Sequence, residues 1–256
     1  MTEAILTVER GMQVLRAFRS ARAPLSNTEL VRRTSLPKAT VSRLTTTLLQ
    51  MGFIRHVSGK RAFELTTRSA AFGHAYLSGS GLAARVNPFL QALADRLDGS
   101  IALAIGDAHE MLYVAYCAGQ QVATLRLGVG TVLSMGSTAV GRAYLWGLAS
   151  DERLRLVSEL TESAGAEGGA LGQSIEQSFA ELRANGACGM IEGYQRATFA
   201  IALPVKLGLA RTPMSLSYDK LAMGTDISSE KARIAHVMKS AAIELEALMA
   251  DFGDRP

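Results

Sequence analysis

The sequence predicts an α+β protein in two parts: a small helical module ending in a β-hairpin, then a larger module around an antiparallel sheet. The chain has 256 residues, more than one domain usually holds, so two domains are expected. Residues 24–65 have the pattern of two helices, a tight turn between them and a basic hairpin. Beyond residue 100, short apolar strands come in runs with helices between them, which is typical of an antiparallel α+β domain.

Charge divides the chain at about the same place. Residues 1–68 hold 12 Lys and Arg against 4 Asp and Glu, whereas residues 69–256 hold 15 against 19. A basic front part joined to a mildly acidic remainder favours one module that meets polyanions and one that does not. Only two cysteines are present and no signal peptide or long apolar run is evident, so we expect a cytoplasmic protein without disulfides or membrane helices.

The N-terminal module begins with a helix predicted over residues 6–19 from apolar positions at helical spacing. Pro24 ends that region. Ser26 and Glu29 then have the spacing of a capping box, in which the Ser26 hydroxyl accepts from the Glu29 amide and the Glu29 carboxylate reaches back to the Ser26 amide. This predicts a second helix that ends near Thr34.

A third helix is predicted over residues 38–50, after a short turn at Ser35 and with Gly52 placed to end it. Its apolar residues Val41, Leu44 and Leu48 lie on one side. Residues 53–57 and 61–65 then read as two strands around a Ser-Gly-Lys turn. Together these elements predict a winged helix-turn-helix.

The third helix has the layout of a helix that enters the DNA major groove, since its first turns carry polar and basic side chains. Arg43 is the best candidate for a bidentate contact to guanine, and Lys60 and Arg61 at the wing tip suit the DNA backbone or minor groove. An alternative is that the module binds only protein and that its basic face is solvated. The candidate DNA-binding residues are Arg10, Ser26, Lys38, Ala39, Thr40, Arg43, Thr47, Lys60 and Arg61.

Several motifs resemble those of the IclR-type transcriptional regulators. They are RGMQVL at 10–15, LPKATVSRL at 36–44, MGFI at 51–54, GTVLSMGSTAVGRA at 130–143 and AIALPV at 200–205. The resemblance implies a winged helix-turn-helix at 1–67, a linker helix at 68–83 and a GAF-like effector-binding domain at 84–256. It also implies a dimer of dimers that binds a double-stranded DNA operator and responds to a small molecule.

The remaining elements of the second module follow from local patterns. Helices are expected at about 87–97, 138–148, 151–160, 174–184 and 229–250. Strands are expected at 101–105, 111–118, 122–127, 187–191, 199–205 and 214–218. The Gly and Ser residues at 78–81 are expected to weaken a continuous linker helix.

Two features predict a pocket for a small organic acid. Ser215 and Ser217 alternate along their strand, so both hydroxyls point to one side, where a buried hydroxyl needs a partner. Gly136 lies where a helix begins, and free backbone N–H groups there favour an anion. The alternative is that both serines face solvent and Ser137 only caps the helix. With the resemblance added, the candidate effector-binding residues are Met135, Gly136, Ser137, Thr138, Glu192, Tyr194, Ala200, Ser215 and Ser217.

The sequence shows no clear motif for catalysis, metal binding or cofactor binding. The four histidines are scattered, and the sequence lacks a phosphate loop, a nucleophile elbow and a dinucleotide fingerprint, so no catalytic residue, metal or cofactor is expected. Ala200, apolar where many family members are polar, favours an effector richer in hydrocarbon than the smallest dicarboxylates, with aromatic acids included. Two alternatives remain: a redox sensor that uses Cys117 or Cys188, and an enzyme whose N-terminal module serves for docking.

Overall fold

The computed structural model describes residues 5–253 except 20, 22, 120–126, 192–197 and 222–226, with residues 227–229 described by their backbone alone. The chain forms two compact units, Met1–Gly79 and Ser80–Pro256. We describe each unit by itself.

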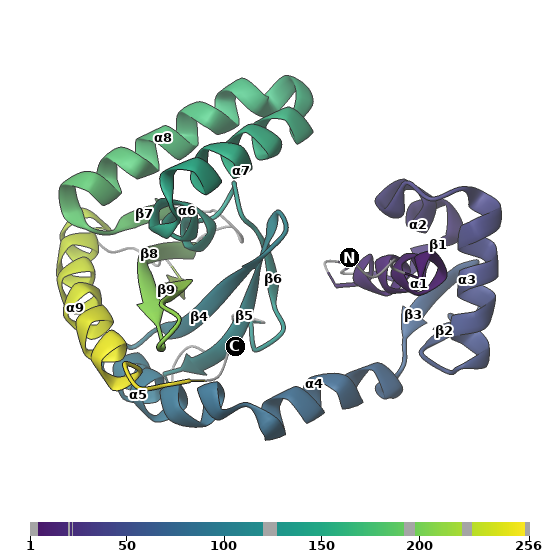
Figure 1. Cartoon of the computed structure of the whole chain (residues 1–256), viewed down its shortest axis with the longest axis horizontal. Helices are drawn as coiled ribbons and strands as arrows, with labels where there is room; N and C mark the ends of the chain where they lie inside the picture. The colour runs from purple at the N-terminus through teal and green to yellow at the C-terminus, as the bar shows by residue number, and fades with distance from the viewer. Residues whose placement is uncertain are drawn as a thin grey trace. The chain divides into compact units, whose positions relative to one another are not determined.

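The first unit is a helical module, α1 to α4, with a small sheet (Figure 1). The strands are antiparallel in the order β1-β3-β2, and the core between helices and sheet includes Val14, Leu30 and Val41, none of which is exposed. The elements are α1 (Leu6–Arg16), β1 (Leu25–Ser26), α2 (Asn27–Thr34), α3 (Lys38–Gln50), β2 (Ile54–His56), β3 (Ala62–Leu65) and α4 (Thr67–Gly79).

Local signals in this unit predict the structure closely. The bounds predicted for α3 are confirmed, and Gly52 follows the helix with φ +74°, a conformation that glycine adopts without strain. The Ser26 hydroxyl accepts from the Glu29 amide at 3.1 Å, as predicted. The reciprocal half of the capping box is wrong, because the Glu29 carboxylate accepts instead from Arg32 and Arg33. The first helix is also shorter than expected and ends at Arg16.

The second unit has a six-stranded antiparallel sheet in the order β6-β5-β4-β9-β8-β7. Helices α6 to α8 cover one face of this sheet, and α5 and α9 cover the other (Figure 1). The elements are α5 (Gly81–Leu97), β4 (Ser100–Asp107), β5 (Glu110–Ala118), β6 (Val132–Ser134), α6 (Ala139–Gly147), α7 (Ser150–Ser163), the 3₁₀ turn η1 (Gly165–Glu167), α8 (Gly168–Asn185), β7 (Cys188–Ile191), β8 (Thr198–Leu207), β9 (Thr212–Leu221) and α9 (Ile227–Leu248).

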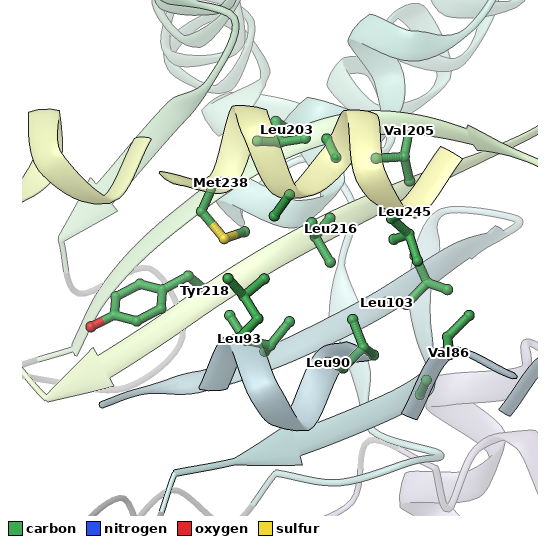
Figure 2. Packing of buried hydrophobic residues seen from close by; sticks show 14 of the residues in the cluster. Val86, Leu90, Leu93, Leu103, Leu203, Val205, Leu216, Tyr218, Met238 and Leu245 are labelled. Atoms are coloured by element: carbon green, nitrogen blue, oxygen red, sulfur yellow. The ribbon is translucent and has the colours of Figure 1, made fainter. Parts of the chain in front are cut away.

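The two sheet faces differ in composition. Figure 2 shows large aliphatic side chains of α5 and α9, among them Leu90 and Leu245, packed against Leu103, Leu203 and Leu216 of the strands. The opposite face carries alanines on β4 and β8 and two serines on β9. The first face is therefore a closed aliphatic core, and the second combines small and polar side chains beneath α6.

Two departures from the sequence expectations concern whole elements. Strand β6 was not predicted, because it depends on pairing with β5, whose residue Met111 lies opposite Leu133, 22 residues further along the chain. No single helix spans 68–83, since α4 ends at Gly79 and the Ser80 hydroxyl caps α5 by accepting from the Ala83 amide at 3.2 Å. The strand expected at 122–127 falls almost entirely outside the described residues.

Candidate DNA-binding and effector-binding sites

Helix α3 presents one polar face to solvent. Val41, Thr45 and Leu48 are buried, with exposures of 0%, 3% and 7%. Leu44, predicted to be buried, is only partly so, and Thr45 takes the buried position because its hydroxyl donates to the Val41 carbonyl. On the opposite face, exposed residues recur at helical spacing along the whole helix: Lys38, Ala39, Ser42, Arg43, Thr46, Thr47 and Gln50.

Cations on this face and on the wing have no partner within the described part of the chain. No hydrogen bond or ion pair involves the side chains of the five cations that were predicted to meet DNA: Arg10, Lys38, Arg43, Lys60 and Arg61. Other cations of the same unit are engaged. Arg32 and Arg33 reach Glu29 at 2.6 and 2.9 Å, and Arg55 reaches Glu64 at 2.6 Å. Four of these five cations thus lie on the recognition helix or the wing, and the fifth, Arg10, lies on α1.

The acidic residue of α2, Glu29, is held between two arginines. Hydrogen bonds from Arg32 and then Arg33 lower the pKa of Glu29 from 4.5 to about 2. Two of the residues predicted to contact DNA already make intramolecular hydrogen bonds. The Ser26 hydroxyl caps α2, and the Thr47 hydroxyl donates to the Arg43 carbonyl at 3.1 Å. Ser42 and Thr46 were missed by the sequence prediction, although their spacing from Arg43 places them on the same face.

The predicted effector residues divide into two groups. Ser215 and Ser217 are buried on the sheet face beneath α6, because Ser217 pairs with Ala102 and Ala202, both of which belong to that core. Met135 and Ala200 pack in the same core. By contrast Ser137 is exposed, and Glu192 and Tyr194 lie outside the described residues.

The turn before α6 is held tightly against the helix. Thr138 is the N-cap: its hydroxyl accepts from the Gly141 amide at 3.3 Å and donates to the Ser134 carbonyl at 2.7 Å. A Cβ at Gly141 would lie 2.0 Å from the Met135 carbonyl oxygen, so only glycine permits this approach. The helix therefore begins one residue later than predicted, with Gly136 and Ser137 in the turn before the cap.

Both strand serines have intramolecular partners. Ser215 donates to the Leu203 carbonyl at 3.3 Å. Ser217 lies 3.3 Å from Oδ2 of Asp219 and 3.4 Å from the Tyr113 hydroxyl, which itself lies 3.4 Å from that Oδ2. Asp219 was not predicted as a site residue. A strand continued past Tyr218 would have placed it on the same side as the two serines.

A buried cation joins the turn before α6 to α8. Arg142 is 5% exposed, and its guanidinium donates to the Gly136 carbonyl at 2.9 Å, the Ser174 carbonyl at 2.9 Å and the Ser178 hydroxyl at 3.0 Å. Burial lowers the pKa of the guanidinium, and no carboxylate within the described residues pairs with it directly. The sequence analysis gave Arg142 no role of its own beyond its place in the motif at 130–143. In the structure its guanidinium holds the turn at Gly136.

A cavity of about 380 Å³ lies between α8, α9 and the edge of the sheet. Its lining includes Lys231, His236 and Lys239 of α9 over the apolar floor of Cys188 and Ile201. It does not include the predicted effector residues. Lys231 is paired with Glu181 at 2.9 Å, so part of the charge is neutralised.

The two cysteines are buried. Burial raises the pKa of Cys188 from 9.0 to about 12 and also raises that of Cys117. Both shifts disfavour the thiolate, which is the reactive form. Within the described residues, no three His, Cys, Asp or Glu side chains are placed to hold a metal ion, and no helix is long and apolar enough to cross a membrane.

A winged helix-turn-helix with free cations on its recognition helix, joined to a second α+β unit, defines a class of DNA-binding regulators. The model of the IclR helix-turn-helix domain matches residues 7–58, and that of the bacterial transcriptional regulator IclR C-terminal region matches residues 74–217. The chain belongs to the IclR family of transcriptional regulators. This confirms the fold class predicted from the sequence and the expectation that the chain is not an enzyme.

Individual relatives agree with this assignment. The chain is 27% identical over 202 residues to the Pca regulon regulatory protein of Pseudomonas putida, covering 78% of this chain and 68% of that one. It is 27% identical to the p-hydroxybenzoate hydroxylase transcriptional activator of Acinetobacter baylyi, covering 55% and 53%. The crystal structure of an IclR family regulator from Brucella abortus matches with a TM-score of 0.74 and 25% identity, covering 94% and 95%. The match spans between half and two thirds of the length of most of the curated relatives.

Proposed function

We propose that this chain binds a partly palindromic operator in double-stranded DNA and that a small organic acid, bound in Ser80–Pro256, changes its affinity for that operator. The first unit would enter the major groove with α3 and hold the backbone with the wing. The protein would act as a dimer or a dimer of dimers, inside the cell, without a cofactor.

The observation that carries the DNA-binding proposal is the distribution of unpaired cations. Lys38 and Arg43 on α3, and Lys60 and Arg61 on the wing, have no intramolecular partner among the described residues, whereas Arg32 and Arg55 are engaged with acids. Phosphate contacts supply most of the affinity of such modules, and a free Arg near the start of the recognition helix can read guanine. Arg16 and Arg19 already have intramolecular interactions and therefore stay outside the proposed set.

Self-association is supported by exposed apolar side chains. Ile5, Val8 and Met12 of the α1 region are 72%, 61% and 55% exposed, and Phe72 of α4 is 67% exposed. Large apolar side chains clustered on one element usually mark an interface. A second copy of the chain would cover them and would give the two-fold symmetry that a palindromic operator requires.

The organic-acid proposal is supported by the sheet face beneath α6. Met135, Ala200, Ser215 and Ser217 lie together there, so two hydroxyl groups and several small side chains share one face of the sheet. The name of the Acinetobacter relative refers to an enzyme of p-hydroxybenzoate, which favours aromatic acids within the class. The redox alternative has weaker support, since burial disfavours both thiolates.

The DNA-binding proposal is tested by selecting binders of the full chain from random duplex DNA. We expect enrichment of a sequence with two-fold symmetry. Arg43→Ala should then weaken binding by about 1–3 kcal/mol and relax preference at one base pair, while Lys60→Ala should weaken all sequences alike and reduce the salt dependence. Arg155→Ala, an exposed residue of α7, is the matched control. Failure to enrich any sequence would contradict the proposal.

The effector proposal is tested by thermal shift of the full chain against aliphatic and aromatic mono- and dicarboxylates. A ligand at about 100 times its dissociation constant should stabilise the unit that binds it by about 2.7 kcal/mol. Ser215→Ala combined with Ser217→Ala should abolish the shift, and the exposed Ser240→Ala should leave it unchanged. A shift that survives the double substitution would place the effector elsewhere, with the cavity at Lys239 as the next site to test.

A further inference from the structure

A polar cluster closes one end of the sheet face on which Ser217 lies. The Tyr113 hydroxyl of β5, the Ser217 hydroxyl of β9 and Oδ2 of Asp219 lie 3.3–3.4 Å from one another. Tyr113 and Ser217 are each 1% exposed, whereas Asp219 is partly exposed. Asp219 is therefore the least enclosed residue of the cluster.

The carboxyl of Asp219 has no cationic partner in the part of the chain that the structure describes. Within the described residues no Lys, Arg or His side chain bonds to its carboxyl, whereas acids elsewhere in this unit have them: Asp98 with Lys220, Glu181 with Lys231 and Glu159 with Arg155. The other titratable side chains facing it come from β5, Tyr113 and Tyr116; β4 and β8 contribute Ser100 and Ala200 as its strand neighbours. The enclosed position raises the pKa of Asp219 from 3.8 to about 6. An acid kept in such a place without a counter-ion costs stability, and such residues cluster at functional sites.

The hydrogen bonds leave acceptor capacity unused. Both hydroxyls bond to Oδ2, and no described group donates to Oδ1. An ionised carboxylate has about four acceptor positions and no donor. The flanking position on β8 is Ala200, whose side chain is a single methyl group. A ligand hydroxyl that reached this carboxyl would therefore find an unused acceptor position.

We propose that Asp219 determines effector specificity by accepting a hydrogen bond from a hydroxyl group of the effector, distant from the effector's own carboxylate, and by excluding acids with a second carboxylate there. This assignment rests on the effector role proposed above. A site that hydrogen-bonds a hydroxyl discriminates strongly against the analogue that lacks it, since its own polar group is then left unpaired. Like charges at close range exclude the diacid. The effector class narrows to hydroxylated monocarboxylic acids.

The test titrates the full chain calorimetrically with two matched sets of probes: benzoate, 4-hydroxybenzoate and terephthalate, and butanoate, 4-hydroxybutanoate and succinate. At pH 8 we expect the hydroxy acid of at least one set to bind tenfold or more tightly than the plain acid and the diacid. Asp219→Asn should reduce that preference to less than threefold and admit the diacid. Asp98→Asn, which changes an acid paired with Lys220 beside the same strand, should retain the wild-type preference.

A pH series separates recognition from a merely structural role. Because protonation removes the charge of Asp219, the preference of the wild type for 4-hydroxybenzoate over terephthalate should be smaller at pH 5 than at pH 8. The same comparison in Asp219→Asn corrects for the ionisation of the probes themselves, and the change with pH should be larger in the wild type than in Asp219→Asn. Acids that bind with the same ratios in wild type and Asp219→Asn would overturn this inference and leave the effector proposal standing. Binding of none of the six acids would contradict the effector class itself, and this inference with it.

Discussion

The two units handle charged side chains in opposite ways. In the first unit, Glu29 and Glu64 engage neighbouring arginines, and the cations left over stand exposed on α3 and the wing. In the second unit, a cation at Arg142 is buried and an acid at Asp219 is enclosed, and neither is paired with an opposite charge among the described residues. Exposed free charge suits a polyanion that approaches a rigid surface, whereas enclosed charge suits a small ligand that must be discriminated.

The difference predicts that substitutions will act on different quantities in the two units. Removing a free cation from α3 should change binding and leave stability unchanged. Removing an enclosed charge from the second unit should change mainly the free energy of unfolding of that unit. The single tryptophan, Trp146 of α6, lies in the second unit beside Phe179, so its fluorescence reports the unfolding of that unit alone.

The largest expected effect is at Arg142. Arg142→Met should destabilise the second unit by about 3–4 kcal/mol, because two buried carbonyls and a hydroxyl lose their charged donor. Urea unfolding followed by Trp146 fluorescence measures it. Arg155→Met, which removes an exposed ion pair with Glu159, should cost no more than about 0.5 kcal/mol. A loss below about 1 kcal/mol for Arg142→Met would show that the buried cation does not hold the Gly136 turn.

Substitution of Asp219 should stabilise the second unit, whereas substitution of Arg142 should destabilise it. Its pKa is raised from 3.8 to about 6 in the folded chain, so its contribution to stability is present below pH 3.8 and is lost as the pH rises through 6. Asp219→Asn should therefore stabilise the second unit at pH 8 by at most about 3 kcal/mol, and by less than about 1 kcal/mol at pH 4. The same urea experiment at both pH values measures it. Glu244→Gln, which changes an exposed acid on α9, is the matched control. An equal gain for Asp219→Asn at both pH values would contradict this prediction.

A smaller effect is expected in the first unit at Ser26. Ser26→Ala removes the hydroxyl that accepts from the Glu29 amide and should destabilise α2 by about 1 kcal/mol. Hydrogen exchange of the α2 amides measures it. Ser58→Ala at the exposed wing tip is the control, since no described contact depends on its hydroxyl. Unchanged exchange in α2 would mean that the cap contributes little.

The cysteines should show no effect. Because burial raises the pKa of both thiols, iodoacetamide at pH 8 should label neither Cys117 nor Cys188 in the native chain and both after unfolding. Mass spectrometry measures the labelling. Rapid native labelling of either residue, together with a change in DNA binding, would revive the redox alternative.

Sequence patterns predicted the first unit more fully than the second for a physical reason. The bounds of α3 and the cap at Ser26 depend on neighbours within about four residues, which the sequence displays directly. Strand β6 depends on pairing with β5, and Asp219 becomes a site residue only because β9 continues to Leu221 beside β4 and β8. The burial of Arg142 could not be predicted from the sequence, because an arginine in a helix usually faces solvent and its three acceptors lie up to 36 residues away.

In the proposed function, an acid bound in the second unit changes the affinity of the first unit for DNA. The most direct measurement determines the operator dissociation constant with and without saturating acid, and the acid dissociation constant with and without saturating operator. Linkage requires both ratios to be equal, and a coupling of about 5–150-fold is expected. An acid that binds tightly while leaving the operator affinity unchanged would contradict the claim.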